Sequence, residues 1–550
     1  MKYCLPVLGL LLALAAAAPA APPYRPRTPH DGAAAGRAVT RVDRAEAPAA
    51  APAPTGTARV AVLLIDFSDD AGDVVHTVAY YTDVLFTNAA GKLNHYWRQA
   101  SRQQLALTGT VDPGGWRRSA HTMAYWGQNS LAGVDDANDA ISNLAREAVQ
   151  LADAAVDFSS FDTDGDSIVD YLVIVHAGSG EEYTGTAGQI YAHSDTIPGG
   201  VAVDGVTVSR YILVPEDASL GLLAHEFGHA LGLPDLYNTA TGDPVVGEWD
   251  LMDQGMWNGI TPGSTPALPT AWQQILLGWV APETLNRRNH AGDVLGPWSD
   301  TPAAVKLVVS DSEYFLIENR QWSGYDAQLP NEGLLVWHCD DRVGSIADNT
   351  INNGATRRVE LLEADGTESI NNDGGDPFPG TTGKRMLSDT TTPSLRANGG
   401  AATGLRIHNI GFTADTATAD LYGYDTSPPV ITLLAPVPGG CTLAMVQLAG
   451  RLTDAAETPA LVMLRHNGAD STLAVTACGG FGGPLTLARG LNILRLSAAD
   501  TSGNSGVSTF GLWLADTLAA APADDSAAYT AVLTGTAALV FPQGAAETLT

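Results

Sequence analysis

Two histidines four residues apart stand in the middle of the chain, within Gly-Leu-Leu-Ala-His-Glu-Phe-Gly-His-Ala-Leu-Gly-Leu-Pro-Asp at residues 221–235. On a helix, His225 and His229 project from the same face, at the separation that two ligands of one metal ion require. Glu226 follows His225 directly, and its carboxylate can accept a proton from metal-bound water. The segment therefore predicts a catalytic zinc site with Glu226 as the general base.

The third ligand must come from outside this helix. Gly232 can adopt the left-handed conformation that ends a helix, and Pro234 prevents the helix from restarting. The chain then bends back, and Asp235 returns towards the two histidines. We expect Asp235 to be the third ligand, and Glu248 is the alternative if the chain does not fold back. Three protein ligands leave a fourth zinc position open, as catalysis requires.

A methionine follows in the sequence Trp-Asp-Leu-Met-Asp-Gln-Gly of residues 249–255. Met252 lies in a glycine-ended turn, where a hydrophobic floor beneath the metal is expected. The 225–235 motif and this turn together resemble the metzincin clan of zinc peptidases. The aspartate in place of a third histidine, with Leu-Tyr behind it at 236–237, resembles the immune inhibitor A family of secreted bacterial metallopeptidases.

The resemblance covers roughly residues 58–424. Further segments that carry it are residues 62–69, 162–166, 173–178, 313–320, 333–338 and 360–366. The resemblance implies a metzincin-like α/β fold and a zinc-dependent endopeptidase that hydrolyses peptide bonds in protein or peptide substrates. It also implies that Met252 supports the ligands without touching the substrate.

A second motif, Asp-Thr-Asp-Gly-Asp-Ser-Ile-Val-Asp, occupies residues 162–170. The carboxylates of Asp162, Asp164, Asp166 and Asp170, with the carbonyl of Ile168, form the oxygen-rich set that Ca²⁺ prefers. The loop departs from an EF-hand because its sixth position is not glycine and a strand follows it. Close carboxylates repel each other without a cation, so we predict a structural calcium loop. An unliganded acidic turn is the alternative.

The elements before the 221–235 segment are predicted to alternate between strands and helices. Residues 60–67 form a continuous apolar run, which is typical of a strand covered on both faces. Strands are predicted at residues 60–67, 105–111, 171–176, 190–193 and 206–214, and helices at 75–87, 92–99 and 136–152. This alternation favours an α/β fold with a twisted sheet.

From about residue 290 the apolar period changes to two, which predicts a β-rich subdomain. Beyond residue 428, short strands and Gly- and Thr-rich turns resemble the immunoglobulin-like sandwiches of exported enzymes. We divide the chain into a signal peptide (1–20), a linker or pro-segment (21–57), a metallopeptidase domain (58–424, with a zinc-binding part 58–285 and a β-rich part 286–424), an immunoglobulin-like sandwich (428–516) and a C-terminal tail (517–550).

Composition restricts the partners and the location of the protein. The chain of 550 residues has a formal net charge of −31, which repels nucleic acid and anionic membranes and favours divalent cations. Residues 1–20 have a basic start, an apolar middle and small residues at the end, as in a cleaved secretory signal peptide. No other stretch is apolar for long enough to span a membrane. We therefore expect a secreted, extracellular protein with no nucleic-acid partner and no integral membrane association.

The cysteines fit an exported protein. Cys441 and Cys478 share the predicted sandwich, and in an oxidising compartment they are expected to form a disulfide. Cys339 is expected to be a buried thiol.

Two other classes of function stay open. A calcium-dependent adhesion or matrix-binding protein would account for the calcium loop and the sandwich, with a degenerate zinc site. The intact Glu226 argues against this class, since a dead site need not keep its base. A non-peptidase zinc hydrolase is the other alternative.

Overall fold

The computed structural model describes residues 54–514, except for 130–134, 136, 286–288, 300–303, 367–373, 423–427, 442, 455–458, 460, 477 and 501–503. The predicted signal peptide (1–20), all but the last residues of the predicted linker (21–57) and the predicted tail (517–550) lie outside the described residues.

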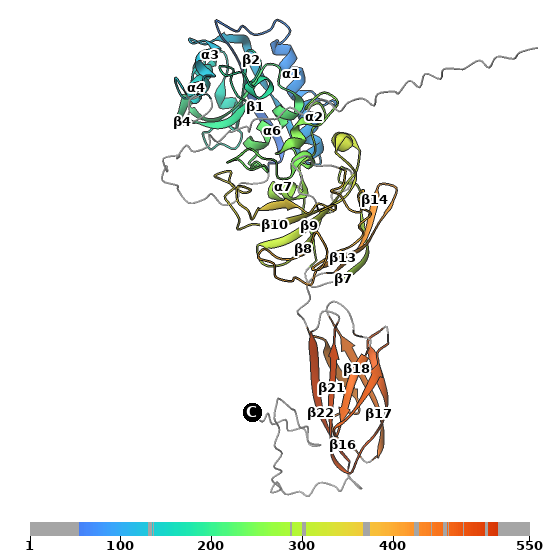
Figure 1. The fold of residues 1–550 in the computed structure, drawn as a ribbon. Coiled ribbons are helices and arrows are strands. Elements are labelled where there is room, and N and C mark those ends of the chain that lie inside the picture. The colour runs from blue at the N-terminus through green and yellow to red at the C-terminus, as the bar shows by residue number, and fades with distance from the viewer. Residues whose placement is uncertain are drawn as a thin grey trace, which may run out of the picture.

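The first part of the chain is built on a five-stranded sheet in the order β2-β1-β3-β5-β4. Strands β2, β1, β3 and β5 run parallel, whereas β4 lies at the edge and pairs antiparallel with β5. The strands are β1 (Gly56–Asp66), β2 (Leu105–Arg118), β3 (Tyr171–His176), β4 (His193–Val203) and β5 (Val206–Pro215). The predicted α/β organisation is therefore observed (Figure 1).

Both faces of this sheet are covered, because successive β1 side chains enter different cores. Val62 packs in the core that contains α1, α2 and α6, and Leu63 packs in the core that contains α4. The helices are α1 (Val78–Phe86), α2 (Leu93–Ala100), α3 (Met123–Trp126), α4 (Ser142–Ala152), α5 (Glu181–Thr184), α6 (Leu220–Ala230) and α7 (Ala271–Leu276). The continuous apolar run of β1 is thus explained by burial on two sides.

The β-rich part contains two sheets, in the orders β11-β10-β9-β8-β6 and β12-β13-β14-β7 (Figure 1). Its strands are β6 (Glu283–Leu285), β7 (Asn289–Leu295), β8 (Val305–Val308), β9 (Glu313–Arg320), β10 (Gly333–Asp340), β11 (Val359–Leu361), β12 (Leu387–Ser388), β13 (Arg406–Thr413) and β14 (Thr416–Tyr422). Phe315 of β9 belongs to the core between the two sheets. Leu316 and Trp337 face the other way and join the core that contains α6. Helix α6 and the β-rich part therefore share one hydrophobic core.

The last described part is a β-sandwich with its own core. Its sheets have the orders β15-β17-β20 and β16-β22-β21-β18-β19. The strands are β15 (Val430–Ala435), β16 (Gly439–Cys441), β17 (Met445–Thr453), β18 (Leu461–His466), β19 (Ala469–Ala474), β20 (Gly480–Thr486), β21 (Gly490–Ala499) and β22 (Ser505–Leu514). An immunoglobulin-like class for this sandwich stays a prediction.

The predicted Cys441–Cys478 disulfide is not formed in the structure, where Cys478 is a free, exposed cysteine. Cys441 ends β16 beside Leu514, shortly before β17 begins. Cys478 precedes a glycine whose carbonyl accepts a hydrogen bond from Leu452 N, near the far end of β17. The length of β17 separates the two positions by roughly 25 Å, whereas a disulfide needs Cα atoms about 4.4–6.8 Å apart. Cys339 is buried and free, as predicted.

The strand predicted at residues 190–193 is also wrong, since β4 begins only at His193. Carboxylates satisfy the preceding backbone N–H groups instead of a neighbouring strand. Tyr191 N donates to Asp135 Oδ2 (2.9 Å) and Ala192 N donates to Glu182 Oε2 (3.2 Å). Among the helices of the described residues, none has the length and apolar character needed to cross a membrane.

Candidate metal centre

Helix α6 begins and ends where its sequence indicates. The hydroxyl of Ser219 accepts a hydrogen bond from Leu222 N at 3.2 Å and so caps the helix N-terminus. At the other end Gly232 has a φ of +100°, a conformation that glycine adopts without steric cost. Leu233 N then donates to Gly228 O at 3.0 Å, which closes the helix as in a Schellman motif. The chain reverses after this turn.

The reversal brings Asp235 to the two histidines. Asp235 Oδ1 lies 3.2 Å from His225 Nε2 and 3.3 Å from His229 Nε2. Ligand atoms of all three residues lie within 4.8 Å of one another. In a tetrahedral zinc site with bonds of about 2.0–2.2 Å, neighbouring ligand atoms are about 3.4 Å apart. The spacing of the three side chains therefore fits one zinc ion.

The second ring nitrogen of each histidine is held by the backbone. His225 Nδ1 lies 3.1 Å from Leu251 O, and His229 Nδ1 lies 2.9 Å from Leu233 O. A carbonyl only accepts, so in each neutral imidazole Nδ1 carries the proton and Nε2 is the nitrogen left to face the metal position. The backbone thus selects the tautomer that metal binding requires once each ring is neutral.

The site opens on the side of His229. The side chain of His229 is 18% exposed, compared with 1% for His225 and 2% for Asp235. Glu226 is fully buried beside them. Glu248, the alternative third ligand, is exposed on the short 3-10 helix Gly247–Trp249 and lies outside the His225, His229 and Asp235 cluster.

The charges of the three candidate ligands are coupled. Burial disfavours a charged imidazole, but the neighbouring carboxylate of Asp235 raises the pKa of His229 to about 9. Burial alone would raise the pKa of Asp235, but the facing imidazoles of His229 and His225 lower it well below its ordinary value. Without a cation, the proton on His229 neutralises the carboxylate.

Met252 packs against Gly228 of helix α6. It is fully buried, and its sulfur would be 2.8 Å from a Cβ atom placed on Gly228. A Cβ atom at position 228 would therefore force the buried Met252 side chain to shift. Met252 O also accepts a hydrogen bond from Leu236 N at 2.9 Å, so the turn holds the residue next to Asp235.

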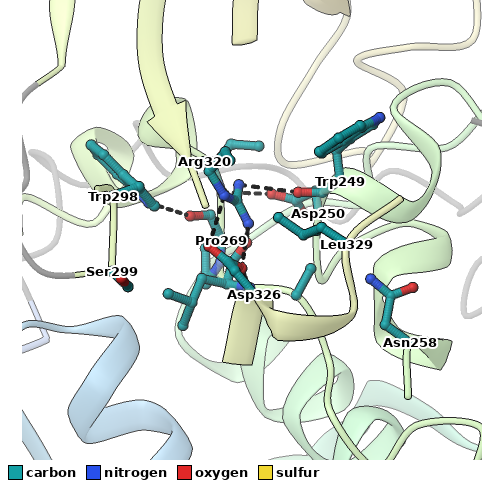
Figure 2. A network of polar contacts seen from close by, with 12 residues as sticks. Trp249, Asp250, Asn258, Pro269, Trp298, Ser299, Arg320, Asp326 and Leu329 are labelled. Carbon is teal, nitrogen blue, oxygen red and sulfur yellow. Dashed lines mark hydrogen bonds and ion pairs between the residues drawn. The ribbon is translucent and has the colours of Figure 1, made fainter. Parts of the chain in front are cut away.

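A buried ionic network, which the sequence did not reveal, lies behind the Met252 turn (Figure 2). Arg320 of β9 is fully buried and forms two hydrogen bonds with Asp326, Nε–Oδ2 at 2.8 Å and Nη2–Oδ1 at 2.7 Å. Its Nη1 donates to Trp249 O at 3.2 Å. Asp250 accepts from Met252 N at 2.6 Å and from Thr270 N at 2.7 Å. The β-rich part thereby fixes the turn that supports the metal site.

The predicted calcium loop brings together Asp162, Asp164 and Asp166, whose carboxylate oxygens lie within 4.8 Å of one another. Asp162 Oδ1 accepts from Gly165 N at 2.8 Å, and Asp166 Oδ1 accepts from Ile168 N at 2.8 Å. Asp170 turns instead to Thr163, whose N–H donates to its Oδ2 at 3.0 Å, and it is outside the cluster. Three of the five predicted calcium ligands therefore converge.

Comparison with known proteins agrees with this site. Residues 55–280 match the family model for the immune inhibitor A peptidase M6 catalytic domain. The pre-pro-metalloprotease PrtV of Vibrio cholerae serotype O1 is 30% identical over 275 residues, which cover 40% of this chain and 30% of that protein. Immune inhibitor A of Bacillus thuringiensis subsp. alesti is 31% identical over 204 residues, which cover 31% of this chain and 29% of that protein.

The motif and these relatives support a metallopeptidase domain, in the class of peptidase hydrolases. Within that class, residues 55–280 are similar to the catalytic domain of the immune inhibitor A peptidase M6 family. The chain spans about 30% of the length of the curated relatives that it matches.

Proposed function

We propose that the protein is a secreted zinc-dependent endopeptidase that hydrolyses peptide bonds in proteins, with a metzincin-like catalytic part. The observation that carries the proposal is the convergence of His225 Nε2 and His229 Nε2 on Asp235 Oδ1, at 3.2 and 3.3 Å, with all three ligand atoms within 4.8 Å of one another. These three residues would hold the zinc ion. When bound, zinc supplies a Lewis acid that polarises the scissile carbonyl and lowers the pKa of water.

Glu226 would act as the general base. It follows His225 on α6 and is buried beside the ligands, so its carboxylate acts in a medium of low dielectric constant. The carboxylate would take a proton from the attacking water and later deliver it to the leaving amine. Met252 would keep the two histidines and Asp235 in place without contacting substrate.

The edge strand β4 would bind the substrate backbone. It lies next to α6 and pairs only with β5 among the described strands. The free backbone groups of an edge strand can form a ladder with an extended peptide. Protein and peptide chains are therefore the substrates that this site suits best.

The proposal is tested by zymography of the purified protein on casein and gelatin, with and without 1,10-phenanthroline. We expect the chelator to abolish clearing and added zinc to restore it. Glu226→Ala should retain one zinc per chain and lose turnover, because the ligands remain and the base is removed. Proteolysis by Glu226→Ala at the wild-type rate would contradict the assigned role. Zinc binding without any proteolysis would instead favour a non-peptidase zinc hydrolase.

A calcium site in the Asp162–Asp170 loop is part of the proposal. The convergence of Asp162, Asp164 and Asp166 supports it, as does the attachment of the loop to the main sheet. Val169 N donates to Thr207 O at 3.0 Å, and Thr207 N donates to Ser167 O at 2.9 Å. An ion there would stabilise the connection that leads into β3.

A further inference from the structure

An asparagine from the β-rich part binds the third candidate ligand at two points. Asn349 Nδ2 donates to Asp235 Oδ2 at 2.5 Å, and Asn349 Oδ1 accepts from Asp235 N at 2.8 Å. The other carboxylate oxygen, Oδ1, is the one that faces both histidines. One side chain therefore fixes both the backbone and the carboxylate plane of Asp235.

The backbone of Asn349 is held in a defined conformation. Its φ is +51°, a left-handed conformation that asparagine tolerates better than most residues. Its carbonyl accepts a hydrogen bond from Thr239 Oγ1 at 2.7 Å. The amide group is therefore presented to Asp235 from a fixed backbone position.

Two further asparagines also connect the segment after Asp235 with the segment that contains Asn349, but neither contacts a candidate ligand. Asn352 Nδ2 donates to Leu236 O at 2.8 Å. Asn353 Oδ1 accepts from Thr239 N at 2.8 Å, and Asn353 Nδ2 donates to Thr239 Oγ1 at 3.0 Å. The loop that contains Asn349 is thus attached to the 235–239 segment at several points, and of these three asparagines only Asn349 contacts a candidate ligand.

We infer that Asn349 is a positioning residue that directs one oxygen of Asp235 to zinc and sets the affinity of the site for the metal; this inference rests on the proposed function. A neutral amide orients the carboxylate without cancelling its negative charge, whereas a Lys or Arg partner would compete with the cation. Hydrogen-bond partners of metal ligands contribute about 10- to 100-fold to metal affinity or activity.

Asn349 lies outside residues 55–280, which match the peptidase family model. The site is therefore completed by the segment between β10 and β11, beyond the residues that match the family model. The residues that match the family model supply the three candidate ligands and the base, and the β-rich part supplies the group that orients one of these ligands.

The test compares Asn349→Gly with the matched control Asn353→Gly in the full chain. Glycine keeps the left-handed backbone of position 349 available, so the change removes the side chain without imposing strain. Zinc affinity is measured by competition with a chromogenic chelator. The visible absorption spectrum of the cobalt-substituted protein reports the geometry of the ligands. Both variants lose hydrogen bonds between the same loops, so a purely structural effect would appear in both.

We expect Asn349→Gly to weaken zinc binding by about 10- to 100-fold and to alter the cobalt spectrum. At saturating zinc its kcat should fall with little change in KM. Asn353→Gly should lower the unfolding temperature but keep the wild-type zinc affinity and cobalt spectrum. Wild-type affinity and spectrum in Asn349→Gly, or equal losses in both variants, would overturn the inference. A wild-type protein that binds zinc but cleaves no protein would overturn the proposed peptidase function alone.

Discussion

At the scale of single residues, the three candidate ligands form a charge-coupled group that would exchange a proton for a metal ion. His229 and Asp235 stabilise each other electrostatically in the metal-free state, because a proton on the imidazole faces the buried carboxylate. Zinc needs the neutral imidazole. The proton on His229 must therefore leave when zinc binds.

This exchange predicts a pH dependence. The pKa of His229 is raised from 6.5 to about 9 in the metal-free protein, so the stability that its pairing with Asp235 contributes is fully present below pH 6.5 and is lost as the pH rises through 9. Between these values, zinc binding should release about one proton per ion, and affinity should increase about tenfold per pH unit. Calorimetry in two buffers of different ionisation enthalpy measures the proton count. A value of zero at pH 7.5 would contradict the pairing.

At the scale of elements, the Met252 turn depends on β9. Arg320 connects β9 to the turn through Trp249 O and to the segment before α7 through Leu268 O, at 3.2 and 3.1 Å. Asp326 accepts from Leu268 N at 3.0 Å. The guanidinium thus joins three elements at one buried point, which an ammonium group with a single nitrogen cannot reproduce.

Arg320→Lys should therefore lower the free energy of unfolding by about 3–5 kcal/mol, because carboxylates remain buried without the two-point partner. Chemical denaturation of the zinc-loaded protein measures this change. Lys92→Ala is the control, since Lys92 pairs with the half-exposed Asp83 at 2.6 Å and should change stability by less than about 1 kcal/mol. Similar losses of unfolding free energy in the two variants would show that the buried network stabilises the protein no more than an exposed ion pair does.

The acidic loop before β3 gives a second prediction at this scale. Calcium should raise the unfolding temperature of the protein, and Asp164→Asn should remove most of that increase because it deletes one of three converging carboxylates. The exposed Asp153→Asn serves as the control for the loss of one negative charge. Unfolding is followed in EGTA and in millimolar calcium. If Asp164→Asn keeps the full calcium response, the ion does not bind in this loop.

Sequence patterns predicted contacts between residues that are close in sequence, and they did not predict contacts between residues that are far apart in sequence. The geometry of residues 225–235 depends on local sequence. The helix period sets the two histidines on one face, the glycine that ends the helix lets the chain reverse, and the structure brings the three candidate ligands together. The contacts of Asn349 and Arg320 join segments far apart in sequence, so no local pattern revealed them. Repeated asparagines at 349, 352 and 353 were the one available signal. The disulfide prediction failed because sharing a sandwich says nothing about which end of it each cysteine occupies.

At the scale of the whole molecule, α6 lies in a core that is shared by two sheets. The core that contains Phe227 and Met252 extends from β1 on one side to Leu316 and Trp337 of the β-rich part on the other. The β-rich part is therefore integral to this core, because it forms one side of the core around the helix that carries the histidines. The sandwich of β15–β22 has a separate core and supplies none of these residues.

The contacts between residues 235–239 and 349–353 have a consequence for biosynthesis. The chain emerges from the ribosome with the histidines first, and the amide that orients Asp235 follows 114 residues later. A nascent chain that ends shortly after α7 carries the whole HExxH helix but lacks this amide and the Arg320 support. The zinc affinity proposed for the complete site should therefore be reached only when synthesis has passed residue 353.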